Sequence, residues 1–409
     1  MKRIAEVSLW VFGGLLTLVL GFIGYVEWRW VTPYDAPYPA VKADMSPEAM
    51  ARGRALFEVK CLICHRAEGS PTASGKPLAD VPKELGTIYS ANLTRDERAG
   101  IGKLTDEEIA RAVRFGVTHD GRRSVMGWGL SDEDLAAVIG YLRSDDPLFA
   151  GDPKPMPKTE LTLLGKAIVA SVYGAPPAFP ATELKAPLQS DLVARGSYLA
   201  REVYDCAECH TEGFGRAKYD ADRSYAGGQK LVQANGEAIF TANLTFHETG
   251  LAGWSREDFG RALTLGLAAD GTPLRAPMPK FRTASEADLD ALYAFFRSLP
   301  PRPAHGAAAR RTPHPPKRPA EAPAGRAPKD LFVSLGCIGC HGPGAPQHQA
   351  ILDARGKPPE RLAAWIRHPE QFKPGTQMPT FAPLLTEAEA LELGRWVSEG
   401  NVPAPIGRR

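Results

Sequence analysis

Residues 61–65 read Cys-Leu-Ile-Cys-His, and the same pattern returns as Cys-Ala-Glu-Cys-His at 206–210 and as Cys-Ile-Gly-Cys-His at 337–341. On a helical turn, residues three apart lie on one face. Two cysteines three apart, with a histidine directly after the second, form the attachment site of a c-type haem. Both sulfurs then reach the vinyl groups of one porphyrin, and the histidine presents its imidazole to the iron. The three motifs therefore predict three covalently bound haem c groups.

Two other chemistries use paired cysteines, and the sequence argues against both. The chain has six cysteines, and all six lie in the three motifs. A zinc site would need the pairs to combine, because no further cysteine is available. A thioredoxin-like redox pair would not explain a histidine after the second cysteine in every copy. The prediction is haem attachment to Cys61, Cys64, Cys206, Cys209, Cys337 and Cys340, with proximal iron ligands His65, His210 and His341.

The N-terminus predicts a membrane anchor. Residues 7–26 form a twenty-residue run without a charge, which is long enough to span a hydrocarbon core of about 30 Å. Lys2 and Arg3 precede the run, and Trp28 and Trp30 follow it as an interfacial aromatic belt. We expect residues 1–30 to be a cytoplasmic N-terminus and single-pass anchor in the inner (cytoplasmic) membrane, with the haem domains in the periplasm. The alternative is a cleaved signal peptide, whose apolar region would normally be shorter and end at a small-residue site. The sequence alone leaves the retention of this helix open.

Composition limits the classes of partner. The chain has 409 residues and a net charge of +2, so the total charge does not point to nucleic acid. The length agrees with two to four domains.

The first two haem regions repeat one another. The features that recur, given for the first and then the second copy, are Arg-Gly at 52–53 and 195–196, Ala-Asn-Leu-Thr at 91–94 and 242–245, capping-box helix starts at 105–108 and 255–258, Asp-Gly turns at 120–121 and 270–271, and last helices that end near 144 and 298. Matched order and spacing of unlike residue types predicts one fold duplicated.

The fold class predicted is all-α, with three cytochrome c-like haem domains behind one transmembrane helix. The predicted domains are residues 45–147, 191–299 and 329–409, with an ordered connecting strap at 148–190 and a Pro/Arg-rich disordered linker at 300–328. The linker would allow the third domain to move between partners, whereas haems one and two would form a rigid pair.

Three methionines are the predicted sixth ligands of the irons. Each lies after a haem motif and before the last helix of its domain, at Met126, Met278 and Met378. A thioether on the open side of a His-ligated haem gives a six-coordinate iron with a raised potential, which suits electron transfer. A methionine is more often core filler, but the count of one per domain favours ligation. His119 is an alternative to Met126, because it lies seven residues away in the same loop.

The motifs of residues 45–300 resemble those of the multihaem cytochrome c subunits of bacterial membrane-bound dehydrogenases, which serve alcohol, gluconate and related sugar-acid dehydrogenases. The third domain resembles a small single-haem cytochrome c, with Pro-Gly-Thr-Gln-Met-Pro-Thr-Phe at 374–381 as its ligand loop. The resemblance implies that electrons pass from a catalytic subunit through the haems to membrane quinone or an oxidase.

The function predicted is electron relay rather than catalysis. The partners expected are a dehydrogenase subunit, a quinol-oxidising complex or a terminal oxidase, together with the membrane. The rival is a haem enzyme of the dihaem-peroxidase type with one open haem site. A methionine for every haem argues against that rival, because a peroxidase needs a vacant sixth position.

Overall fold

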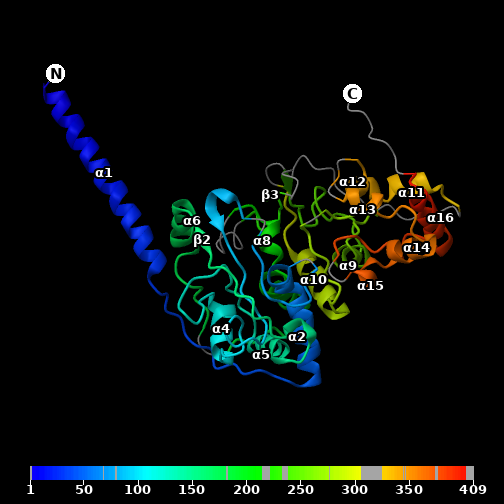
Figure 1. Ribbon diagram of the computed structural model, residues 1–409, viewed down its shortest axis with the longest axis horizontal. Helices are drawn as coiled ribbons and strands as arrows, with labels where there is room; N and C mark the ends of the chain where they lie inside the picture. Colours follow the sequence, from blue (N-terminus) through cyan, green and yellow to red (C-terminus); the bar gives the residue numbers. More distant parts are fainter. Residues whose placement is uncertain are drawn as a thin grey trace. The chain divides into compact units, whose positions relative to one another are not determined.

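The structure is a computed structural model that describes residues 2–67, 69–78, 81–180, 183–213, 222–232, 238–275, 277–304, 325–343, 345, 347–373 and 376–401. The chain forms two compact units. Unit 1 holds the described residues up to Ala186 together with Glu202–Tyr204, and unit 2 holds the others. Helices dominate both units (Figure 1), which agrees with the predicted all-α class.

Unit 1 contains the N-terminal helix and the first haem motif. Its helices are α1 (Lys2–Val31), α2 (Pro47–Lys60), α3 (Leu62–His65), α4 (Asp106–Phe115), α5 (Asp132–Arg143) and α6 (Leu163–Ile168), with the short turns η1 (Lys83–Leu85), η2 (Pro147–Phe149) and the π-helical η3 (Val169–Tyr173). The strands β1 (Gly86–Thr87) and β2 (Glu160–Leu161) pair antiparallel, with Gly86 opposite Leu161.

Unit 2 contains the second and third haem motifs. Its helices are α7 (Leu192–Tyr198), α8 (Cys206–His210), α9 (Arg256–Leu265), α10 (Glu286–Ser298), α11 (Pro328–Ser334), α12 (Cys337–His341), α13 (His348–Leu352), α14 (Pro359–Arg367), α15 (Pro369–Phe372) and α16 (Glu387–Ser398). The π-helical turn η4 (Leu199–Val203) follows α7. The strands β3 (Lys230–Val232) and β4 (Ala238–Phe240) form a second antiparallel pair, with Leu231 opposite Ile239.

The helix starts follow the capping chemistry that the sequence predicted. The Thr105 hydroxyl accepts a hydrogen bond from the Glu108 amide, and the Glu108 carboxylate accepts one from the Thr105 amide. Ser255 and Thr386 begin α9 and α16 in the same reciprocal way. These bonds satisfy amides that have no partner within the helix, so each helix begins at a defined residue.

A glycine brings the first and last helices of each repeated domain into close contact. A Cβ placed on Gly53 of α2 would lie 2.0 Å from the backbone oxygen of Ala137 in α5. A Cβ on Gly196 of α7 would lie 1.9 Å from the backbone oxygen of Ala291 in α10. Only glycine allows two helix backbones to approach this closely. The Arg-Gly pairs found in the sequence therefore mark the helix crossing.

The arginine of each Arg-Gly pair reaches an acidic residue near the start of the last helix. Arg52 lies 2.8 Å from the Asp134 carboxylate, and Arg195 lies 3.9 Å from that of Asp288. Both acids are buried. The duplication predicted from sequence is thus visible in the contacts of both copies.

The strap packs on the rest of unit 1. The Asn92 side chain donates to the backbone oxygen of Asp152 at 2.9 Å, and strand β2 is paired with β1. Lys166 of α6 forms an ion pair of 2.7 Å with Glu27 near the end of α1. An ordered segment accounts for these contacts better than a free tether.

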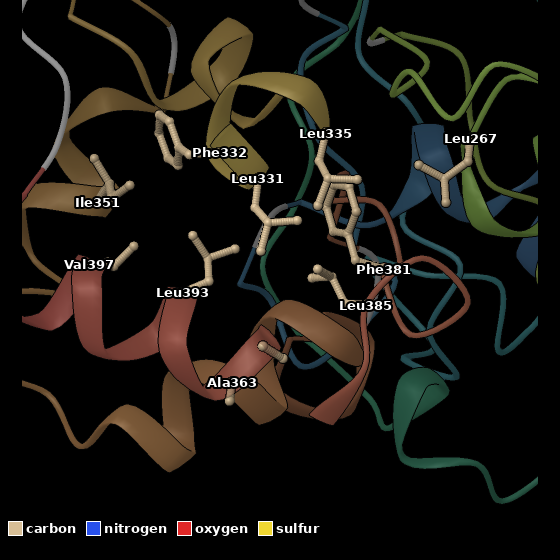
Figure 2. Close-up of a cluster of buried hydrophobic side chains, with 11 residues drawn as sticks. Leu267, Leu331, Phe332, Leu335, Ile351, Ala363, Phe381, Leu385, Leu393 and Val397 are labelled. Carbon is tan, nitrogen blue, oxygen red and sulfur yellow. The ribbon is translucent and has the colours of Figure 1, made fainter. Parts of the chain in front are cut away.

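The third domain is built on a buried apolar cluster (Figure 2). Leu331 and Phe332 of α11 face Leu393 and Val397 of α16, with Ala363 of α14 beside them. Much of the predicted linker, residues 305–324, lies outside the described residues. Its two described ends are packed: Ala304 is buried, and Arg326 is held by Glu389 of α16.

Arg326 and Glu389 set a pH dependence for this domain. Two hydrogen bonds of 2.7 and 3.0 Å from the guanidinium hold the pKa of Glu389 at about 2, below its ordinary 4.5. A lowered carboxylate pKa stabilises the fold above about pH 4.5, and this stabilisation is lost as the pH falls from 4.5 through 2. Arg326→Ala should cost about 2 kcal/mol at pH 7, because the buried Glu389 carboxylate loses its charged partner and keeps only the hydrogen bonds from Thr386. The cost stays this small because the Arg326 guanidinium is partly exposed.

Hydrogen exchange of the α11 and α16 peptides measures this effect. A matched control is Arg367→Ala, because Arg367 forms an ion pair with Glu387, which is exposed and lies on α16 like Glu389. The control should change the free energy of local opening by less than about 0.5 kcal/mol. Equal protection in both variants, or an Arg326→Ala deficit that persists below pH 2, would contradict this account.

Candidate haem sites

Each haem motif forms a short helix, and the segment before it determines where that helix begins. α2 leads directly to Cys61, whose backbone then begins α3. Before α8 and α12 the chain turns through the left-handed conformation, at Asp205 with φ 55° and at Gly336 with φ 73°. The motif helices place the two cysteines and the histidine of each copy on one turn.

Each of the three motif histidines makes the same kind of hydrogen bond, from Nδ1 to a backbone oxygen. His65 Nδ1 lies 2.8 Å from the backbone oxygen of Ala91, and His210 Nδ1 lies 2.7 Å from that of Ala242. His341 Nδ1 lies 3.0 Å from the backbone oxygen of Gln347. A carbonyl oxygen only accepts, so Nδ1 carries the proton in each ring and Nε2 keeps its lone pair. This is the arrangement of a metal-binding histidine whose tautomer is fixed by its outer partner.

Burial keeps two of these rings neutral. It lowers the pKa of His65 and of His341, against the weaker opposing effect of the backbone hydrogen bonds. A histidine must be neutral to donate its lone pair to a metal. A neutral ring with its proton on Nδ1 keeps the Nε2 lone pair that ligation would use, and iron ligation by His65, His210 and His341 stays a prediction.

In the first two sites, the backbone oxygens that accept the Nδ1 hydrogen bond belong to the repeated Ala-Asn-Leu-Thr stretches. The Asn92 side chain accepts from the Thr94 amide at 2.9 Å and from the Thr94 hydroxyl at 2.6 Å. Asn243 accepts from the amide and hydroxyl of Thr245, both at 2.8 Å. The asparagine thus folds the loop that presents the preceding alanine carbonyl to the histidine. The repeat is visible in the sequence, but this role of its asparagine is not.

The third site obtains the same bond from a different loop. The Gln347 amide donates to the backbone oxygen of Cys340 at 2.9 Å, while the Gln347 oxygen accepts from His341. His348 lies outside the three motifs, and its Nδ1 lies 3.0 Å from the His341 backbone oxygen. No repeated motif marks Gln347, and its role follows from the folded loop alone.

Cys61, Cys64, Cys206 and Cys337 are half-buried, whereas Cys209 and Cys340 are exposed. Burial raises the pKa of Cys61 and of Cys337 to about 12. Thioredoxin-like pairs depend instead on a lowered thiol pKa. Within the part of the chain that the structure describes, no three His, Cys, Asp or Glu side chains gather into a metal site. The cysteine pairs therefore stay in three separate motifs.

The methionines lie in loops between the last two helices of their domains. Met126 is half-buried, and its backbone oxygen accepts from Arg123 at 3.0 Å. Met278 and Met378 are also half-buried, and the Met378 amide donates to the Thr376 hydroxyl at 3.2 Å. His119, the alternative to Met126, is exposed. Ligation of the irons by Met126, Met278 and Met378 stays a prediction.

The residues present fit covalently held haem. Each copy supplies two thiols on one helical turn, a histidine with its Nδ1 proton engaged, and a half-buried methionine in a later loop. Bound haem would supply a one-electron couple at each such site. The two thiols of each motif would hold the haem covalently, and the motif histidine would orient its iron.

Comparison with known proteins supports this chemistry. Residues 50–145 match the family described as cytochrome c. The chain contains cytochrome c domains. Residues 323–397 match the family described as cytochrome c oxidase, cbb3-type, subunit III, which places a cytochrome-like match on the third domain as well.

The chain also resembles the cytochrome subunits of fructose, alcohol and gluconate dehydrogenases. It is 28% identical over 283 residues to the fructose dehydrogenase cytochrome subunit of Gluconobacter japonicus, covering 64% of this chain and 55% of that one. It is 29% identical over 220 residues to the cytochrome c subunit of a quinone-dependent alcohol dehydrogenase of Gluconobacter oxydans, covering 50% and 44%. The gluconate 2-dehydrogenase cytochrome c subunit of Pantoea cypripedii is 28% identical over 306 residues, covering 70% and 64%. The chain spans about half the length of the curated relatives it matches.

These relatives confirm the predicted resemblance to the cytochrome c subunits of dehydrogenases. Their being cytochrome subunits agrees with the predicted role of this chain in electron transfer rather than catalysis. One helix within the described residues, over Trp10–Val31, is long and apolar enough to cross a membrane, and a signal sequence would pass the same test.

Proposed function

We propose that the chain is a membrane-anchored tri-haem cytochrome c that accepts electrons from a dehydrogenase partner on the periplasmic side and passes them to a downstream acceptor. The observation that supports it most is the bond shared by all three motif histidines, from Nδ1 to a backbone carbonyl. Two repeated Ala-Asn-Leu-Thr loops and one loop of unrelated sequence supply the three carbonyls with the same result. A structural histidine would not need this arrangement three times.

The N-terminal helix supports anchoring in the cytoplasmic membrane. Trp10 is 81% exposed and Leu18 is 72% exposed, so this apolar surface has no protein partner within the described chain that could cover it. Hydrocarbon would bury such a surface at no cost to the helix backbone, whose hydrogen bonds are internal. The anchor would keep the haem domains close to membrane-bound partners.

Purification in a mild detergent from native membranes tests the partner. A flavin- or quinoprotein dehydrogenase that co-purifies, identified by mass spectrometry, is the expected result. If only an oxidase or a quinol-oxidising complex co-purifies, the dehydrogenase is not the partner, and the chain acts further downstream in the relay. Recovery of the chain in the soluble fraction rather than the membrane fraction would contradict the proposed membrane anchor.

Carbon monoxide tests the proposed methionine ligands. The reduced native protein should bind no carbon monoxide, because every iron already has six ligands. Met278→Ala and Met378→Ala should each bind about one equivalent per chain and lower the potential of one haem. In the first domain, Met126→Ala should open the haem and His119→Ala should not.

The absorption change on adding carbon monoxide to the reduced protein measures both results. A matched control is Met156→Ala, because Met156 is half-buried in the strap and lies outside the three ligand loops. Rapid adduct formation in the native protein would favour an enzyme with an open haem site. An open first haem in His119→Ala, with a closed one in Met126→Ala, would exchange the two assignments.

A further inference from the structure

Within unit 2, the loop that carries Met278 lies against the loop that carries Met378. Lys280, two residues after Met278, donates a hydrogen bond from Nζ to the backbone oxygen of Met378. Arg282 donates to the backbone oxygen of Thr376 at 3.4 Å. The two proposed ligands, Met278 and Met378, are thus connected by a short path. It runs from Met278 to Lys280, two residues along the chain, and through one hydrogen bond to the Met378 backbone.

An ion pair fixes the same contact from its edge. The Arg282 guanidinium lies 3.8 Å from the Glu370 carboxylate at the start of α15. The Thr380 hydroxyl donates to the same carboxylate at 2.9 Å, which orients it toward the arginine. All three side chains are buried or half-buried, so water screens the pair only in part.

An apolar contact completes the interface. Leu267, which follows α9, is fully buried in the cluster that forms the core of the third domain. Figure 2 shows Leu267 on a segment separate from α11 and α16, with Phe381 and Leu385 on the side of the cluster toward it. The Thr380 amide donates to the backbone oxygen of Leu265 at 3.3 Å. The core of the third domain is therefore closed by a residue of the second.

This packing differs from the freely moving third domain that the linker suggested. A residue with no exposed surface cannot leave its cluster without exposing apolar area to water, which is unfavourable. The Arg282 contact and the backbone bonds add to that cost. The two domains behave as one body within unit 2.

We propose that this contact is a fixed electron-transfer interface between the second and third haem sites, with Arg282 and Glu370 as its positioning residues. The inference rests on the proposed function, because it names the route inside the same relay. One electron passes from one site to the other, so one is oxidised as the other is reduced, and no bond or proton is exchanged. The linker then serves to connect the docked domains rather than to let one travel.

Cleavage of the linker tests the docking in the full haem-loaded chain. A protease site is inserted within residues 305–324 and cut after purification. Size-exclusion chromatography with haem staining then follows the C-terminal fragment. The fragment should stay with the rest of the chain at 0.1 M salt. Its separation at every protein concentration would overturn the proposal.

Charge variants test the positioning residues. Arg282→Glu places two carboxylates together and should raise the dissociation constant of the cut fragment about tenfold, or 1.4 kcal/mol. Glu370→Arg should do the same, and the double variant that exchanges the two charges should restore retention. Arg361→Glu, at an exposed position of α14, is the matched control and should change nothing. Full retention in Arg282→Glu, or no recovery in the exchanged pair, would remove both residues from the interface.

Rapid photoreduction of the uncut protein adds the electronic readout. Electron equilibration between the second and third haems should slow in Arg282→Glu and recover in the exchanged pair. A docked fragment in a chain that no dehydrogenase reduces would refute the proposed function and leave the docking intact. A released fragment in a chain that still relays electrons would refute the interface alone.

Discussion

Gly196→Val is expected to prevent the second domain from closing. A Cβ at position 196 would lie 1.9 Å from the backbone oxygen of Ala291 and 2.6 Å from Cβ of Phe295. A backbone atom cannot move aside unless α7 separates from α10, and valine adds two further methyl groups. We expect a cost of about 4 kcal/mol, which is a large share of the stability of a small domain.

Haem content and hydrogen exchange measure this loss. The peptide that contains residues 206–210 should lose most of its haem, and the α10 peptides should exchange rapidly. Gly196→Ala should cost about half as much, because it adds the Cβ alone. Ser197→Ala on the same helix is the control and should leave both readouts unchanged. Normal haem loading and protection in Gly196→Val would contradict the close helix crossing.

Asn243→Ala is expected to disturb the second haem site without touching its ligands. The Asn243 side chain accepts from the amide and hydroxyl of Thr245 and donates to the backbone oxygen of Arg302 at 2.7 Å. Its removal leaves buried polar groups without partners, which should cost about 3 kcal/mol. The loop that presents the Ala242 carbonyl to His210 then loses its fixed position.

A merely structural role would lower stability and leave the haem potential alone, so the potential is the deciding readout. Loosening the Nδ1 hydrogen bond makes the imidazole a weaker donor and should shift the second haem potential upward, with the other two unchanged. Asn243→Asp keeps the acceptor and should give a smaller shift. Asn401→Ala, at an exposed amide, is the control. An unshifted second potential in a folded Asn243→Ala protein would restrict this asparagine to stability.

The parts of the site that the sequence predicts are the repeated motifs and the residues that cap helices. The cysteine-histidine motifs stand on consecutive positions, and Thr105, Ser255 and Thr386 begin helices through bonds to residues three positions away. Such short-range chemistry leaves a local signature. The duplication also pointed to Gly53 and Asn92 before their roles were known.

The parts that sequence does not predict join residues far apart in the chain. Lys280 resembles any loop lysine, and only the fold brings it to Met378. Burial there lowers the pKa of Lys280 to about 7, which composition could not indicate. Ala304 looked like linker, yet its amide bonds to the Thr249 hydroxyl at 2.8 Å. Tertiary contacts of this kind follow no period and carry no motif.

The decisive measurement is the number of covalent haems on the mature chain. Intact mass spectrometry of the protein from membranes, before and after replacement of each cysteine pair by alanine, gives that number. We expect a chain carrying three covalent haem masses, and a loss of one haem in each double-alanine variant. A mature chain with two or fewer haems, or a motif whose cysteines can be replaced without losing one, would contradict it.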